Sequence, residues 1–414
     1  MTKEKIFSYV SYAAVVVFAV LFLYFGNRIA SQNLVIDFGD TEDGPVRARV
    51  TQVLDVLEYD EDFWGQTTVL FDAELMSGEE RGSVVRAWQN IVAHFAGLEA
   101  VVEEGDRVLL WQFGEEWHFA DYVRINNIIF LGIAFLVLLL IFGRVKGLNT
   151  ILSLGFTCVA IFAVFIPSIL SGHNIYLSAV IVCVFTVVIT LFLLNGINGK
   201  SIAAVVGCLG GVLAAGLLTV FMGRVLRLTG ITEGDTMQLL FLPMEDTIDL
   251  NGLIFAGILI GAVGAIMDVA VSISSALHEL KSNAENISFF SLYKSGITIG
   301  KDIIGSMTNT LVLAYIGSSL TVILLLVVYS SSLTELFNRE HVIVELMQSI
   351  IGSMGVILAM PLTALVAAAL STGNERKGSN ENQNESQNVN QNENQYQSGE
   401  EQTTDNKGGA ISNE

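Results

Sequence analysis

Long runs of apolar residues separated by short polar stretches fill the chain from residue 126 to residue 370, and one further run lies near the N-terminus. A helix needs about 20 mostly apolar residues to cross a bilayer, and these runs reach that length. The pattern predicts an α-helical polytopic membrane protein. We expect eight transmembrane helices, at residues 6–25, 126–143, 148–168, 174–194, 201–222, 252–277, 303–330 and 342–370.

Alternating apolar and polar positions replace the long runs between residues 27 and 124. Segments such as VRARVTQVLDV and TTVLFDAELM are rich in β-branched residues, and SGEERG and EEGD lie between segments of this kind. This pattern is typical of strands with one buried face joined by turns. We therefore expect a small all-β domain here, either a barrel or a sandwich.

Four parts follow from these patterns. Residues 1–26 form an uncleaved N-terminal transmembrane anchor, 27–124 the β-rich domain, and 125–371 a domain of seven transmembrane helices. Residues 372–414 are dominated by Asn, Gln, Glu and Ser. Such a segment buries too little apolar surface to fold, so we expect a disordered tail.

The basic residues predict the orientation of the helices. If the N-terminus lies in the cytoplasm, eight spans place every lysine of the chain on the cytoplasmic side. Cytoplasmic flanks carry the excess of Lys and Arg in membrane proteins. We therefore expect both termini inside and the β-rich domain exported to the outer side.

Charge and composition exclude several kinds of partner. The net charge is −20, and residues 27–124 hold 20 acidic residues against 7 basic ones. No basic cluster is present to neutralise phosphates, so we expect no nucleic acid partner. Cys158, Cys183 and Cys208 all fall inside predicted spans, and the five histidines are dispersed. We expect the lipid bilayer as partner, with no metal site and no cofactor.

Small and polar residues recur at helical spacing in two of the predicted spans. Residues three or four apart share one face of a helix, and that face is a packing surface when it is made of glycine. In span 201–222 it holds Gly207 and Gly211. In span 252–277 and the residues after it, the face holds Gly257, Gly261, Gly264, Asp268, Ser272, Ser275 and Glu279. We expect Asp268 to point into the bundle.

Depth suggests a partner for Asp268. At about 1.5 Å per residue, Asp268 lies about 13 Å from the cytoplasmic end of its span, and Asn309 lies about 12 Å into the next. The Asn309 amide and the neighbouring Thr308 hydroxyl can donate hydrogen bonds to a carboxylate. Lys301 and Asp302 are expected at the cytoplasmic face. Further polar groups lie near the outer end of the last span, where Glu345 and Ser349 share a face, and there Glu345 is either interfacial or part of a polar path.

At these residues the chain resembles the YibE/F family of bacterial membrane proteins. The resemblance rests on LIFAGILIGAVGAIMDVAVSISSALHEL, LYKSGITIGKDIIGSMTNTLVLAYIG and ELMQSIIGSMGVILAMPLTALVAAAL, and on SGEERG, EEGDRVLL and DYVR in the exported part. It covers residues 45–371 and implies a multi-pass protein of the bacterial cytoplasmic membrane, without an established activity. Because members are often encoded in pairs, the resemblance also implies a paired family member or a second copy as partner. It supports the importance of Asp268, Asp302 and Asn309.

An aspartate inside the bilayer usually marks an ion, proton or substrate path. We therefore expect a transporter or permease-like protein for an ion or small solute, and a structural hydrogen bond between helices is the alternative role of Asp268. A different class is a non-catalytic subunit or scaffold of a cell-envelope complex. An intramembrane protease would need Asp268 and Asp302 close together, and their expected depths differ by about 13 Å. We expect no enzyme.

Overall fold

The computed structural model describes residues 3–32, 44–59, 66–92, 100–232, 234–242, 247–284 and 287–371. The tail predicted over 372–414 lies outside the described residues. The chain divides into two compact units, one formed by residues 1–35 with 148–414 and the other by residues 36–147.

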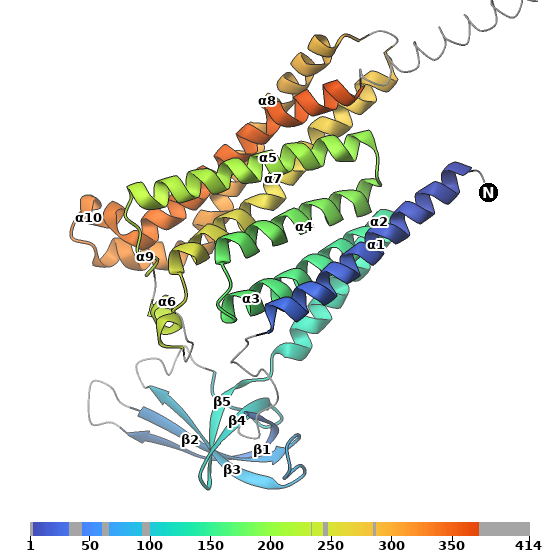
Figure 1. Ribbon diagram of the computed structural model, residues 1–414. Helices are drawn as coiled ribbons and strands as arrows, with labels where there is room; N and C mark the ends of the chain where they lie inside the picture. The colour runs from blue at the N-terminus through green and yellow to red at the C-terminus, as the bar shows by residue number, and fades with distance from the viewer. Residues whose placement is uncertain are drawn as a thin grey trace, which may run out of the picture. The chain divides into compact units, whose positions relative to one another are not determined.

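The unit of residues 36–147 contains a closed five-stranded barrel, so the barrel is the correct one of the two β architectures expected (Figure 1). The strands follow one another around it in the order β1-β2-β3-β5-β4, and only the β3–β5 pair is parallel. Alternate side chains such as Val69, Phe71 and Ala73 fill its interior, as the sequence alternation predicts. The strands are β1 (Val46–Tyr59), β2 (Gln66–Leu75), β3 (Val84–Val92), β4 (Arg107–Phe113) and β5 (Glu116–Tyr122).

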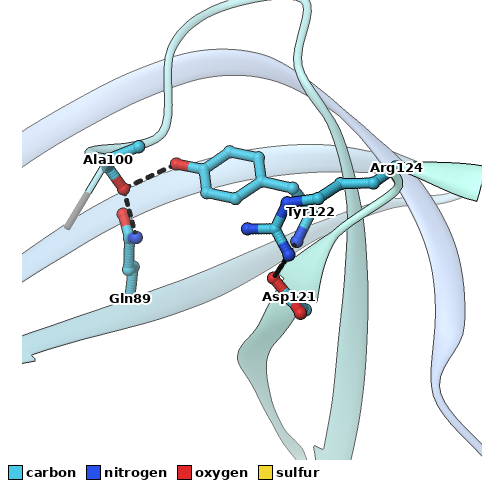
Figure 2. Close-up of polar contacts among 5 residues, drawn as sticks. All are labelled: Gln89, Ala100, Asp121, Tyr122 and Arg124. Atoms are coloured by element: carbon cyan, nitrogen blue, oxygen red, sulfur yellow. Dashed lines mark hydrogen bonds and ion pairs between the residues drawn. The ribbon is translucent and has the colours of Figure 1, made fainter. Parts of the chain in front are cut away.

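A polar network fastens the segment before β4 to the barrel wall. Figure 2 shows the buried side chain of Gln89 and the hydroxyl of Tyr122 both donating to the Ala100 carbonyl, at 2.9 and 2.7 Å. The side-chain amide oxygen of Gln89 accepts from the Val102 backbone N–H at 2.9 Å. Burial raises the pKa of the Tyr122 phenol, so this hydroxyl remains a donor at neutral pH.

Among the described residues, six helices are long and apolar enough to cross a membrane, or seven when the bent pair α8 and α9 counts as one span. The chain is therefore mostly helical and multi-pass, as expected (Figure 1). The spans are α1 (Lys3–Ala30), the run Ile125–Leu170, α4 (Ile175–Asn195), α5 (Gly199–Val225), α7 (Leu250–Ser282), α8 (Phe289–Ser318) with α9 (Leu320–Tyr329), and the C-terminal helix Glu340–Ser371.

The run Ile125–Leu170 accounts for the difference from the eight expected spans. It comprises α2 (Ile125–Ala160), a π-helical turn (Ile161–Phe165) and α3 (Ile166–Leu170), 46 residues in all. The run is broken at Arg144, whose φ of 48° and ψ of −123° are not helical, between the two expected spans 126–143 and 148–168. A side chain on Gly147 would collide with the Leu139 carbonyl, although a straight helix would separate these residues by about 12 Å.

Contacts within the larger unit show that the second half of this run lies along the helical bundle as a separate span. Asn149 lies at one end, where its side chain contacts the Tyr12 hydroxyl and the Leu193 carbonyl. Ser171, at the other end, donates to the Ala30 carbonyl at 2.6 Å. Residues 149–171 therefore run beside α1 from the Tyr12 level to the Ala30 level. This agrees with the division of the run into two spans that the sequence predicts.

The residues between the expected spans 252–277 and 303–330 are mostly helical. α7 continues to Ser282, and α8 already begins at Phe289, where the Ser288 side chain caps it by accepting from the Ser291 N–H. The polar residues between Ser291 and Asp302 lowered the apolar signal on which the expected boundary at 303 was based. The expected span boundary at 303 is therefore wrong, because the helix begins at Phe289.

Glu340 holds the turn that follows α5 in place through hydrogen bonds. Its carboxylate accepts from the backbone N–H and the hydroxyl of Thr229, at 2.7 and 2.8 Å, and from the Gly230 N–H at 2.6 Å. Gly230 has a φ of 87°, and a Cβ there would collide with Leu250. The first residue of the C-terminal helix thus fixes a turn about 110 positions earlier in the chain.

We expect Glu340→Ala to destabilise the helical bundle by about 2 kcal/mol or more, because it leaves two backbone N–H groups and a hydroxyl without their acceptor. The melting temperature of the full chain in mild detergent measures this. Glu335→Ala is the matched control, since its carboxylate pairs with Arg339 at an exposed site and exposed ion pairs contribute little. Equal melting temperatures for the two variants would contradict the role of Glu340.

Candidate functional site

The glycine and aspartate stripe of α7 lies on one face of the helix, and that face is exposed in this unit. Gly257, Gly264, Asp268 and Ser272 are exposed, whereas Ile266 and Ile273 are fully buried. α7 therefore packs through its bulky apolar face, mainly against α5. The expectation that Asp268 points into the bundle is not met: the stripe presents its carboxylate on the surface of the helix that the unit leaves uncovered.

The predicted packing glycines divide into two groups. A side chain on Gly207 would collide with Thr363, and one on Gly211 would lie 2.7 Å from the Gly355 carbonyl oxygen. These two glycines of α5 therefore admit the C-terminal helix at close range. Gly261 is covered by the Tyr315 hydroxyl, 2.5 Å from its Cβ position. The remaining two, Gly257 and Gly264, meet no described atom within 4 Å of that position.

Two contacts fix the register of α7 against α8. Gly300 of α8 lies against Ile273, and Tyr315 lies over Gly261. Because the two helices are antiparallel, these contacts place Asp268 at the level of residues 305–308 of α8, within about one helical turn of Thr308 and Asn309.

The polar groups at this level are arranged unevenly. The Thr308 hydroxyl is buried and makes no hydrogen bond within the described part of the chain. Asn309, in contrast, is exposed, and no hydrogen bond joins it to Asp268 among the described residues. The pairing of Asp268 with Asn309 stays a prediction. On the same face as Asp268, Ser272 is exposed and Ser275 is partly buried.

Lys301 and Asp302 lie within α8 rather than before it, and both are exposed. The contact between Gly300 and Ile273 places Asp302 about one helical turn from Asp268 in depth, or about 5 Å. The sequence suggested about 13 Å. The two carboxylates therefore lie closer in depth than expected, on neighbouring helices.

A second polar group lies between α7, α8 and the C-terminal helix. The Tyr315 hydroxyl and one carboxylate oxygen of Glu345 are buried, and neither makes a hydrogen bond to the described residues. The Gln348 amide nitrogen lies 3.4 Å from the Cβ position of Gly261, beside the Tyr315 hydroxyl. Ser349 is buried on the same helix as Glu345. One carboxylate oxygen of Glu345 is therefore part of a buried polar cluster.

The chain bends immediately after this cluster. α8 ends at Ser318, α9 begins at Leu320, and the two axes differ by 63°. Ser319 between them is buried, with 6% of its surface exposed. The backbone of Ser319 remains hydrogen-bonded across the bend, to the Tyr315 carbonyl and the Ile323 N–H.

Known proteins were compared with the chain as a whole. A sequence profile described as YibE/F-like protein matches residues 131–373, which is more than half of the 414 residues. The chain belongs to the YibE/F family. Neither a curated protein nor a solved structure matches it.

The YibE/F match covers the helices that carry both polar groups. It includes Asp268, Asn309 and Glu345, so the family assignment expected from the sequence is confirmed. The match begins at residue 131 and does not reach the barrel, although the sequence resemblance extended to residue 45. The family match therefore gives no information about the barrel.

Sequence reasoning missed one member of the buried cluster in this YibE/F protein, Tyr315, and placed Gln348 beside Glu345. Tyr315 was not singled out, because an aromatic residue in an apolar span is ordinary. Gln348 had a signal: it follows Glu345 by three positions and shares its helix face. No group of three or more potential metal ligands lies together in the described ranges.

Proposed function

We propose that this YibE/F protein transports an ion or a small solute across the cytoplasmic membrane of a bacterium, with residues 27–124 on the outer side. The observation that carries the proposal is the bend between α8 and α9 beside the buried oxygen atoms of Tyr315 and Glu345. Buried polar atoms in a bilayer-spanning bundle are costly, and they are retained where they bind an ion, a proton or a substrate. Asp268 and Thr308 extend the polar groups deeper into the same pair of helices.

The loose packing of the bent pair supports a moving element. α8 has 30 residues, of which only Leu292, Gly296, Gly300 and Leu311 are buried, and α9 has no buried residue. α7, of similar length, has a continuous buried face from Leu250 to Leu277. Elements with few buried contacts open at the lowest free energy. Alternating access then takes place by movement of α8 and α9 against a firmer bundle.

Reconstitution of the full chain into vesicles tests the proposal. Fluxes of protons, Na⁺, K⁺ and phosphate are measured with trapped indicators, under a membrane potential and with protein-free vesicles as reference. We expect flux of at least one of these ions and its loss in Glu345→Gln, which removes the carboxylate from the buried cluster. Glu335→Gln, in the short exposed helix α10 (Leu333–Asn338), is the matched control. Transport is contradicted if the wild type conducts none of them or if Glu345→Gln conducts like the control.

A scaffold within an envelope complex is the second candidate function. It is favoured by exposed aromatic residues on the barrel, where the ring of Phe113 lies 6.5 Å from Trp111 and 5.6 Å from His118. Exposed aromatic groups are enriched in protein interfaces. Crosslinking of the full chain in membranes, with Phe113→Ser as the variant, separates this candidate from transport, because it alone predicts a crosslinked partner that the variant loses. An enzymatic activity is not part of the proposal.

A further inference from the structure

A cavity of ≈ 610 Å³ opens between the ends of α4, α5 and α7 and the C-terminal helix, and neither Asp268 nor Glu345 lines it. One part of its lining is apolar and includes Val220, Leu228, Ile254, Phe255 and Met347. The other part carries hydrogen-bond donors, from Asn174, Tyr176, Arg224, Arg227 and Asn251. The cavity therefore combines an apolar wall with a cationic one.

The two arginines supply the charge of the cationic wall. Arg224 lies in the last turn of α5 and Arg227 in the turn after it. Both are exposed, and neither forms an ion pair with any residue that the structure describes. A guanidinium presents several N–H donors in a plane and matches phosphate or carboxylate oxygens two at a time. Two acids lie in this region and both have backbone partners: Asp249, beside Tyr176, caps α7 through the Gly252 N–H, and Glu340 accepts from Thr229 and Gly230.

The backbone around these arginines is held in an uncommon conformation. Arg227 has a φ of 53°, which side-chain-bearing residues adopt rarely and at a cost. The turn is fixed on its other side by Glu340, through Thr229 and Gly230. The first turns of α4 and α7 also line the cavity, and their N-termini are capped by the side chains of Asn174 and Asp249. The backbone that carries the two arginines is therefore fixed by the fold.

We propose that this cavity binds a phosphate-bearing ligand, with the phosphate at Arg224 and Arg227 and the apolar part against Phe255 and Ile254. A free phosphorylated solute and the headgroup of an anionic phospholipid share this chemistry. The cavity lies at the end of three spans, where both are within reach. The proposal is independent of transport, because it concerns binding at a site separate from Glu345 and Asp268.

Binding to the purified full chain tests the site in two arms. In the first, inorganic phosphate and glycerol phosphate are titrated against the protein in detergent, with binding measured calorimetrically. In the second, the protein is placed in bilayer discs with or without phosphatidylglycerol, and retained lipid is measured by mass spectrometry after extraction. Binding in the first arm identifies a free solute, and binding in the second alone identifies a lipid. Either result supports the site.

The double variant Arg224→Gln with Arg227→Gln should weaken the binding found by at least about tenfold, as loss of one charge-assisted contact or more requires. Arg28→Gln is the matched control, since Arg28 is an exposed arginine in the last turn of α1 and does not line the cavity. Substitution of both arginines by lysine should restore part of the affinity. No binding in either arm overturns the proposal, and so does an equal loss in the Arg28 variant.

Discussion

Replacing Asp268 by asparagine should reduce ion flux through the reconstituted protein to that of protein-free vesicles, while the melting temperature stays within a few degrees of the wild type. Asparagine has the size of aspartate and keeps hydrogen-bonding atoms, but it cannot gain or lose a proton at neutral pH. Asp268 is exposed on its helix face and has no hydrogen bond to the described residues. The substitution therefore removes a charge and disrupts no packing.

The expected result depends on the position of Asp268 in depth. It lies within about one helical turn of Thr308, whose buried hydroxyl makes no hydrogen bond to the described residues, and about one to two helical turns from Asp302. A carboxylate at this depth costs about 2.5 to 3.5 kcal/mol on insertion scales, so a function is the usual reason for its presence.

The Asp268→Glu variant is the control for this prediction, because it keeps a titratable carboxylate and should keep measurable flux. Full flux in Asp268→Asn would rule out a role for its proton. A fall in melting temperature with unchanged flux would instead assign Asp268 a structural hydrogen bond, the alternative that the sequence left open.

Replacing Gly211 by leucine should prevent the helical bundle from assembling. The Cβ position of Gly211 lies 2.7 Å from the Gly355 carbonyl oxygen, 2.8 Å from the Ala359 Cβ and 2.9 Å from a methyl carbon of Ile266. One of these atoms belongs to the backbone, and α5 is held between two helices, so no rotamer change relieves the overlap. Overpacking of a close-packed core costs about 1 to 3 kcal/mol, and we expect a value at the top of that range or above it.

The control for Gly211→Leu is Gly257→Leu, in which the same side chain is added to a membrane-spanning helix at a glycine that meets no described atom within 4 Å. Size-exclusion profiles and melting temperatures of the two variants in detergent give the comparison. We expect aggregation or a strongly lowered melting temperature for Gly211→Leu alone. A similar loss in Gly257→Leu would reveal that the exposed stripe of α7 packs against a further helix.

The periodicity of apolar residues in the sequence predicts most of the helices and strands. The alternation at residues 46–59 and 66–75 predicts strands that the barrel contains, and the apolar runs predict the spans to within a few residues except at α8. α8 begins earlier than expected because its first turns are amphipathic. Hydropathy averaged over a window of residues is low for such turns, so they resemble a polar loop.

The direction in which a face points could not be read from the sequence. Spacing places Gly257, Asp268 and Ser272 on one face, and the structure agrees, but it does not turn that face inward. In water, the apolar face of a helix points to the core. Within a bilayer, both lipid and protein interior accept apolar side chains, so hydropathy does not distinguish them. The cluster of Tyr315, Glu345 and Gln348 joins residues about 30 positions apart, and it depends on helix contacts that no local pattern encodes.

The contacts of α5 hold it rigidly against the C-terminal helix, whereas α8 and α9 are free to move relative to this pair. Gly207 and Gly211 admit the C-terminal helix at Thr363 and Gly355, and at the far end Glu340 ties the same two helices through the turn after α5. Two helices joined near both ends cannot slide or tilt against each other without breaking one of the joints. They therefore move as one rigid unit. We expect the hinge of any conformational cycle to lie at Ser319, between the end of α8 and the start of α9.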